Sequence, residues 1–196
     1  TRTQIASLQR RLCVTTVYVT HDQTEAMTMG DRVAVLKDGY LQQCDAPRRM
    51  YDHPANVFVA GFIGSPAMNL LDVPVTDGGV KLGNHTVAVD RSVIAKATGG
   101  RVTLGVRPED LDLVTDGSGL EVSVDVVEEL GADAYVYGTP EGVSQIGSDG
   151  EDSSHKPFLA RVDGRRPPKR GERIHLVPKP GHIHIFDSVS GERLND

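Results

Sequence analysis

The sequence predicts an α+β protein in which a mixed helix–strand segment precedes an all-β, OB-like barrel. Two observations carry this fold class. Helical periodicity is confined to the first third of the chain, and short strand-like runs separated by Gly, Asp and Pro follow from residue 68 onward. The composition changes at Gly64-Ser65, which predicts a first domain over residues 1–64 and a second over residues 65–196.

The overall composition excludes several classes of protein. Charged residues make up 24% and hydrophobic residues 38% of the 196 residues, which excludes collagen, coiled coils and low-complexity disordered chains. A net charge of −6 argues against sequence-independent nucleic-acid binding, which needs a basic surface. The two cysteines, Cys13 and Cys44, are too few for a disulfide scaffold or a zinc site, so a reducing, cytoplasmic setting is expected.

The first elements are a helix and a strand. Ile5, Leu8 and Leu12 recur at i, i+3 and i+7, which places one apolar stripe on a short helix. Residues 14–20 are β-branched and aromatic, and this pattern predicts a buried strand that ends just before His21.

A second short helix is expected directly after His21. Asp22 and Glu25 have the D-x-x-E spacing of a capping box, which predicts a helix over Gln23–Met29 that stops at Gly30.

A hairpin and two further helices complete the first domain. Strands are expected at 32–36 and 40–44, joined by a turn at Lys37-Asp38-Gly39. Pro47 is suited to the first position of a helix, and another helix is predicted over residues 55–62.

Strands dominate the second domain. The predicted runs are 69–75, 79–82, 85–89, 102–107, 120–130, 134–138, 158–162, 173–178 and 182–186. Alternation predicts that Val122, Val124 and Val126 face inward, as a small barrel requires. Residues 141–156 are rich in Gly, Ser, Asp and Glu, which predicts an exposed loop.

His21 is the candidate site residue. It follows a predicted strand and precedes a helix N-terminus, where ligands bind in α/β sheets and where anions are favoured. Such a histidine can donate a hydrogen bond to a phosphate oxygen. The alternative from position alone is a histidine that satisfies a local backbone carbonyl.

Other polar residues favour structural roles. His175, His182 and His184 lack the Cys or carboxylate partners of a closed metal site. The basic residues between 161 and 173 fit a solvated hairpin better than a nucleic-acid surface, because no aromatic residues are interleaved. Carboxylates without a paired His or Lys at a convincing spacing are Asp110, Asp112, Glu128, Glu129 and Asp133.

Several motifs resemble one known family. Residues 16–39, TVYVTHDQTEAMTMGDRVAVLKDG, closely resemble the switch-histidine segment of ABC transporter ATPases. Residues 47–71, with YDHPAN and FVAGFIGSP, look like the maltose-type subfamily that energises sugar and glycerol-phosphate importers. The runs LGVRPEDL (104–111), EELG (128–131) and HIHIFD (182–187) resemble the OB-like regulatory domain of that subfamily, also called TOBE.

This resemblance implies that His21 is the switch histidine, which contacts the γ-phosphate of ATP and helps to hold the attacking water. It implies ATP and Mg²⁺ as cofactors of the full-length subunit. The sequence contains no G-x-x-x-x-G-K-[ST] phosphate loop, no L-S-G-G-Q signature and no apolar strand ending in Asp-Glu. We therefore expect a segment holding the end of an ATPase core plus the regulatory domain, with no cofactor bound and no hydrolysis by itself.

The resemblance also implies partners and a location. A homodimer would sandwich ATP and dock on membrane permease subunits at the inner face of the cell membrane, and a regulator could bind the barrel. Nucleic-acid and metal binding are not expected. One departure from the family pattern is Cys13, where a Gly is expected in the helix-to-strand turn. The alternative function is a small-molecule-sensing OB-like binding module.

Overall fold

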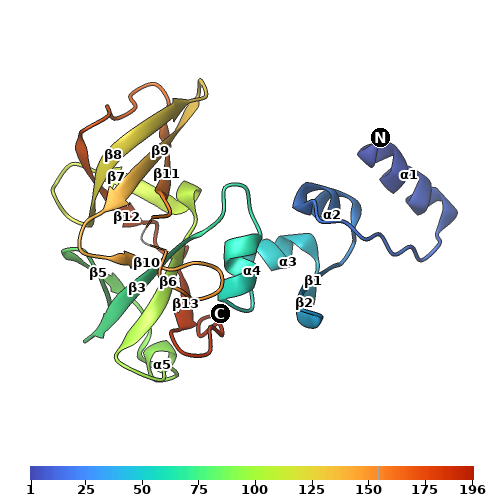
Figure 1. The fold of residues 1–196 in the computed structure, drawn as a ribbon, viewed down its shortest axis with the longest axis horizontal. Coiled ribbons are helices and arrows are strands. Elements are labelled where there is room, and N and C mark those ends of the chain that lie inside the picture. The colour runs from blue at the N-terminus through green and yellow to red at the C-terminus, as the bar shows by residue number, and fades with distance from the viewer. Residues whose placement is uncertain (154) are drawn as a thin grey trace. The chain divides into compact units, whose positions relative to one another are not determined.

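A computed structural model describes residues 1–153 and 155–196 of the chain. The chain divides into two compact units, unit 1 (Thr1–Ala55) and unit 2 (Asn56–Asp196), and each is described by itself. Most of the regular structure is β-strand and lies in unit 2 (Figure 1). Across the two described ranges, no helix is long and apolar enough to cross a membrane.

Unit 1 begins with the helix that the apolar spacing predicts. Its elements are α1 (Arg2–Leu12), α2 (Gln23–Met29), β1 (Val33–Lys37), β2 (Tyr40–Asp45) and α3 (Pro47–Asp52). The apolar stripe of α1 is largely exposed, at 55% for Ile5, 49% for Leu8 and 60% for Leu12. The helix is thus confirmed, but its stripe does not contribute to a core in the described structure.

Residues 14–20 do not form the buried strand that their composition predicts. The described structure has no strand here, and Val17 and Val19 are 87% and 89% exposed. A strand needs a neighbour to pair its backbone N–H and C=O groups. Among the described strands, β1 pairs only with β2, so this segment has no pairing partner. The strand prediction is wrong for this chain, and the α/β character of residues 1–64 stays a prediction.

The β1–β2 hairpin follows its sequence closely. Asp38 and Gly39 both have positive φ angles, 51° and 81°, which is the type I′ geometry that matches the twist of the flanking strands. The two strands pair antiparallel, with Lys37 opposite Tyr40. Pro47 occupies the start of α3 as expected, since its missing N–H costs nothing there.

Unit 2 contains two antiparallel sheets. The first has the order β13-β6-β3-β4-β5 with β10 paired to β3, and the second has the order β11-β9-β8-β12-β7. The first sheet consists of β3 (Asn69–Thr76), β4 (Gly79–Leu82), β5 (His85–Ala88), β6 (Arg101–Val106), β10 (Ser144–Gln145) and β13 (His184–Asp187). The second consists of β7 (Leu111–Val114), β8 (Leu120–Glu129), β9 (Asp133–Pro140), β11 (Phe158–Asp163) and β12 (Arg173–Pro178).

Three helical elements accompany these sheets, namely α4 (Val57–Phe62), α5 (Arg91–Ile94) and the 3-10 turn η1 (Pro108–Asp110). Every strand run predicted for this half is present, with ends that differ by at most two residues. One hydrophobic cluster joins the sheets: Leu71 and Leu104 come from the first, and Val122, Phe158 and Leu176 from the second. The all-β prediction for this half is confirmed.

The predicted inward orientation is wrong for one residue, Val126, because β8 contains a bulge. Val122 and Val124 are buried as predicted, but Val126 is 56% exposed. The register with β9 shifts between Val124 and Val126, which reverses the side-chain alternation beyond that point. Val127 packs against the core instead.

The stretch 141–156 is not simply an exposed loop. Within its described part, β10 pairs with β3, and Gln145 lies opposite Leu71 with only 7% of its surface exposed. The sequence did not predict β10, because two polar residues become a strand only when an existing edge offers hydrogen-bond partners. The prediction of an exposed loop is therefore wrong for Gln145.

Polar contacts to the backbone stabilise the corner after β6. Arg107 is 1% exposed, and its Nη1 donates to the Ile63 carbonyl at 2.9 Å, so its side chain anchors the backbone of this corner. The Glu109 carbonyl accepts from Lys179 Nζ at 2.8 Å. A second apolar cluster of unit 2 contains Val57, Ala60, Met68, Leu70 and Phe186.

Asp187 is a buried carboxylate of unit 2 that accepts several backbone hydrogen bonds. It is 3% exposed, and its oxygens accept from the amides of Thr98 and Ser190 at 2.8 Å each and of Val189 at 3.2 Å. The amides of Ser190 and Thr98 hold the pKa of this carboxyl well below its usual range. The charged form thus stabilises the turn that follows β13.

We predict that Asp187→Asn lowers the free energy of unfolding by about 2 kcal/mol near neutral pH, since one oxygen is replaced by a donor facing N–H groups. A depressed carboxyl pKa contributes stability in full above the unfolded-state value of about 3.9, and this contribution is lost as the pH falls through the folded value. The variant should therefore lose less stability in acid than the parent protein, as measured by urea unfolding over a pH series. Asp77→Asn, at a side chain that is 98% exposed, is the control and should change neither quantity.

The domain boundary between residues 64 and 65 stays a prediction, and it can be tested by truncation. Residues 65–196 should unfold cooperatively in calorimetry, and residues 56–196 should unfold about 5–10 °C higher. The longer polypeptide keeps the apolar contacts of α4 and the Ile63 carbonyl that Arg107 binds. A shorter polypeptide without a cooperative transition would place the boundary elsewhere.

Candidate functional site

His21 lies between the extended residues 14–20 and helix α2. Its side chain is exposed, and within the described ranges its ring makes no hydrogen bond. The alternative in which His21 satisfies a local carbonyl therefore has no support in this structure. The ring is available to a ligand or to another polypeptide.

The N-terminus of α2 is already occupied by the chain itself. Asp22 Oδ1 accepts hydrogen bonds from the backbone N–H groups of Thr24 at 2.8 Å and Glu25 at 3.4 Å. Asp22 is thus the expected N-cap, and the helix ends at Gly30 as predicted. Because a carboxylate holds these two amides, they are not free to bind an anion. The prediction that His21 itself contacts a phosphate is not tested by this contact and stays a prediction.

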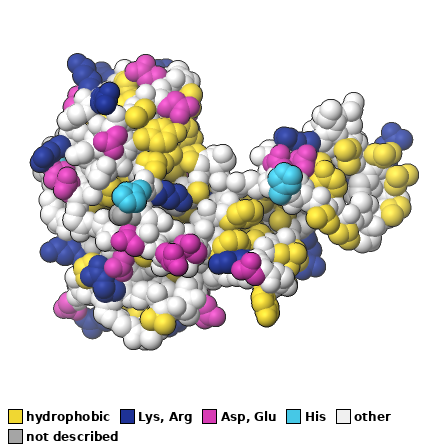
Figure 2. Space-filling view, in the orientation of Figure 1, with side chains coloured by type: hydrophobic (Ala, Val, Ile, Leu, Met, Phe, Trp, Pro, Cys, Tyr) yellow, Lys and Arg dark blue, Asp and Glu magenta, His cyan; other side chains and the backbone are white. Residues whose placement is uncertain are grey.

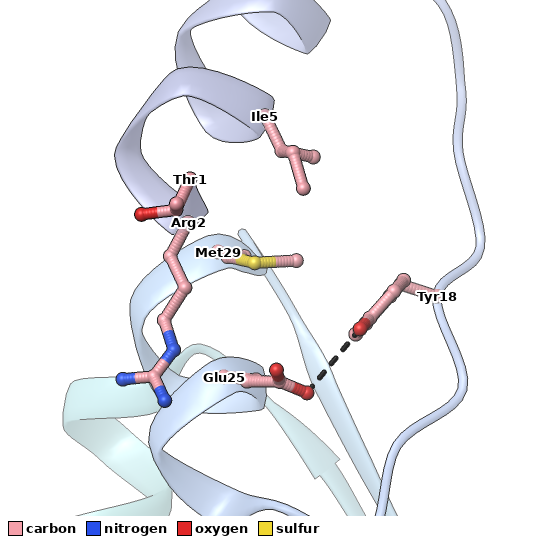
Figure 3. A pocket seen from close by; sticks show the side chains of 6 residues that line it. All are labelled: Thr1, Arg2, Ile5, Tyr18, Glu25 and Met29. Carbon is pink, nitrogen blue, oxygen red and sulfur yellow. Dashed lines mark hydrogen bonds between the residues drawn. The ribbon is translucent and has the colours of Figure 1, made fainter.

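Glu25 does not complete the capping box but bonds to the preceding extended segment. Its Oε2 accepts from the Thr20 hydroxyl at 2.7 Å. The same oxygen accepts from the Tyr18 hydroxyl at 3.2 Å, a bond that is drawn in Figure 3. The negative charge of Glu25, together with this hydrogen bond, raises the pKa of Tyr18 above its ordinary value. Sequence analysis missed Thr20 and Tyr18, since no motif spacing signals a contact across His21.

An open pocket of about 500 Å³ lies beside this cluster in unit 1. Thr1, Arg2 and Ile5 of the first turn line one wall, and Tyr18, Glu25 and Met29 line the other (Figure 3). His21 is not among the lining residues, so the pocket and the candidate histidine are separate features.

The residues around His21 supply one exposed imidazole for ATP and no cradle of free amides. They fit contact with a single phosphate oxygen but not retention of a whole nucleotide. For Mg²⁺, no group of three or more His, Cys, Asp or Glu side chains in the described part could hold a metal ion.

Two of the other histidines, His184 and His182, lie against polar side chains of the protein. His184 is 7% exposed, and its Nδ1 lies 2.8 Å from Arg193 Nη1. Because arginine can only donate, His184 Nδ1 is the acceptor of this hydrogen bond. His182 Nδ1 lies 3.5 Å from Asp110 Oδ1. Burial raises the pKa of Asp110 above its usual value, and the neighbouring His182 opposes that effect.

The basic run of unit 2 has ion pairs at both ends. Arg161 pairs with Asp133 at 2.9 Å and Arg173 with Glu121 at 3.7 Å, across β11–β9 and β12–β8. On the face shown in Figure 2, dark blue and magenta side chains are interspersed rather than gathered by sign. This distribution suits a solvated hairpin, as the sequence predicted.

Comparison with known proteins identifies the class. Residues 64–111 match the family model of the MalK OB fold domain. The chain is 58% identical to the diacetylchitobiose uptake system ATP-binding protein MsiK of Streptomyces coelicolor, over 100% of the chain and 54% of that protein. It is 42% identical to the sn-glycerol-3-phosphate import ATP-binding protein UgpC of Paracoccus denitrificans, over 98% of the chain and 51% of that protein.

A third relative is the trehalose import ATP-binding protein SugC of Mycobacterium tuberculosis H37Rv, which is 42% identical over 98% of the chain and 54% of its own length. The chain is thus a homologue of ATP-binding subunits of ABC sugar importers, and the family expected from its motifs is confirmed. The chain spans about half the length of the curated relatives it matches. The role of His21 stays a prediction.

Proposed function

We propose that this chain belongs to the ATP-hydrolysing subunit of an importer for a sugar or a related solute. The single observation that carries the proposal is its similarity over essentially the whole chain to importer ATP-binding proteins, among them one at 58% identity. Residues 1–64 contribute the end of the α/β ATPase core, and residues 65–196 form the OB-like regulatory domain. The transported solute differs among the named relatives.

His21 acts in this subunit as a donor to the terminal phosphate of ATP. Its exposed ring can approach a ligand held by other parts of the subunit. A hydrogen bond from an imidazole N–H to a phosphate oxygen stabilises the charge of the transferring phosphoryl group, and the same ring orients the attacking water. ATP supplies the reactive phosphoanhydride when it is bound.

Nucleotide and Mg²⁺ are held chiefly by groups that this chain does not carry, since it has no phosphate loop. The chain by itself therefore does not hydrolyse ATP. In the assembled transporter two copies of the subunit pair with two-fold symmetry and dock on the membrane permease subunits, at the cytoplasmic face of the cell membrane. Unit 2 holds the pair together and offers a surface to a regulator.

The role of His21 predicts the behaviour of His21→Ala in the intact subunit. Turnover of ATP should fall at least about tenfold while the Kd for ATP changes much less, because the lost contact stabilises mainly the transition state. Steady-state hydrolysis and equilibrium binding of a fluorescent nucleotide measure the two quantities.

His85→Ala serves as the matched control, because His85 lies on β5 in unit 2 and has no assigned role. It should retain the turnover of the parent protein. Unchanged hydrolysis and transport in His21→Ala would remove His21 from the mechanism.

A further inference from the structure

The backbone on both sides of His21 is fixed by one chain of hydrogen bonds. Glu25 Oε2 accepts from the Thr20 hydroxyl at 2.7 Å, and the Thr20 hydroxyl oxygen accepts from the Asp22 amide at 3.0 Å. Asp22 in turn caps α2 through its carboxylate. Thr20 and Asp22 are the immediate neighbours of His21, so both ends of the peptide that carries it are held to the same helix.

The imidazole itself has no such support. It is exposed and makes no hydrogen bond within the described ranges, so its direction depends on the backbone of residues 20–22. Residues 14–20 cannot supply that rigidity through strand pairing, since no described strand pairs with them. The Thr20–Glu25 hydrogen bond is therefore the contact nearest to His21 that connects the incoming segment to α2.

We propose that Thr20 and Glu25 are positioning residues for His21, a role that rests on the proposed function of His21 in ATP hydrolysis. Neither side chain needs to touch ATP. The carboxylate orients the Thr20 hydroxyl, whose lone pair then holds the Asp22 amide, and this sequence of contacts sets where the His21 ring leaves the chain. A bond to a charged acceptor is stronger than a neutral one, which suits Glu25 to this task.

The geometry separates Thr20 from Tyr18. Tyr18 also donates to Glu25, but over 3.2 Å and from a residue that is 54% exposed. Within the described ranges it makes no hydrogen bond with the backbone beside His21. Thr20 is half-buried and makes the shorter bond. Loss of the Thr20 hydroxyl should therefore matter more than loss of the Tyr18 hydroxyl.

The test uses the intact subunit with Thr20→Val, Thr20→Ser and Glu25→Ala. Thr20→Val preserves shape but removes the hydroxyl, and we expect kcat for ATP hydrolysis to fall about tenfold with KM within twofold, because a misplaced donor weakens only the transition state. Glu25→Ala should behave alike, and Thr20→Ser should restore most of kcat. Thr24→Val is the matched control, since Thr24 is an exposed threonine of the same helix. It should retain the parent kcat.

A double-mutant cycle distinguishes this proposal from the function on which it rests. If Thr20 acts through His21, then Thr20→Val should cause no further loss in a His21→Ala background. Equal losses from Thr20→Val in both backgrounds would overturn the positioning role. A fully active Thr20→Val together with an impaired His21→Ala would also overturn it, but would leave the proposed function of His21 standing. An unimpaired His21→Ala would overturn both.

A measurement without ATP tests the same contact directly. Hydrogen–deuterium exchange of the Asp22 amide should accelerate about tenfold in Thr20→Val, which removes the hydroxyl that accepts from this amide, and in Glu25→Ala, which releases that hydroxyl. Exchange should not accelerate in Thr24→Val, which keeps both groups. Unchanged exchange in Thr20→Val would overturn the proposed chain of contacts, whatever the effect on kcat.

Discussion

The amide side chain of Asn69 joins the two sheets of unit 2, and the packing of the common core depends on that junction. Asn69 is 8% exposed and imitates a strand residue: its Oδ1 accepts from the Leu159 amide at 2.9 Å and its Nδ2 donates to the Leu159 carbonyl at 2.7 Å. The same Nδ2 donates to the Val106 carbonyl at 3.1 Å. One side chain thereby satisfies backbone groups of β11 and β6 that the sheet ladders leave over.

Pairing of backbone groups also explains why residues 14–20 of unit 1 do not form a strand. Residues 14–20 have the composition of a strand but find no partner strand in the described structure. Side chains take over part of the role: Thr20, Asp22 and Glu25 bond to backbone or to one another around His21. The candidate site thus lies where polar side chains attach an extended segment to a helix.

In the proposed function the two units have different roles. In that function, unit 1 presents the exposed His21 with neighbours that are held by hydrogen bonds. Unit 2 has its own apolar core and buried polar anchors, Arg107 and Asp187 among them. Such a self-contained barrel suits a regulatory or dimerising role, because it can keep its shape while its partners change.

The sequence alone determined the elements whose signals are local. Asp22 and Gly30 delimit α2, Asp38-Gly39 makes the hairpin turn, and strand-like runs located the strands of unit 2 other than β7 and β10. His21 was also found from sequence, through its place in a motif. These signals act between residues close in the chain, so they survive without knowledge of the fold.

Only the tertiary structure decided which strands pair and which side chains meet. The bulge that turns Val126 outward, the pairing of Gln145 with Leu71 and the exposure of residues 14–20 all depend on a partner strand distant in sequence, or on its absence from the described ranges. The Thr20–Glu25 bond depends on how an extended segment returns along a helix. Local propensity cannot encode these outcomes, because a strand becomes stable only through hydrogen bonds and buried area that another segment provides.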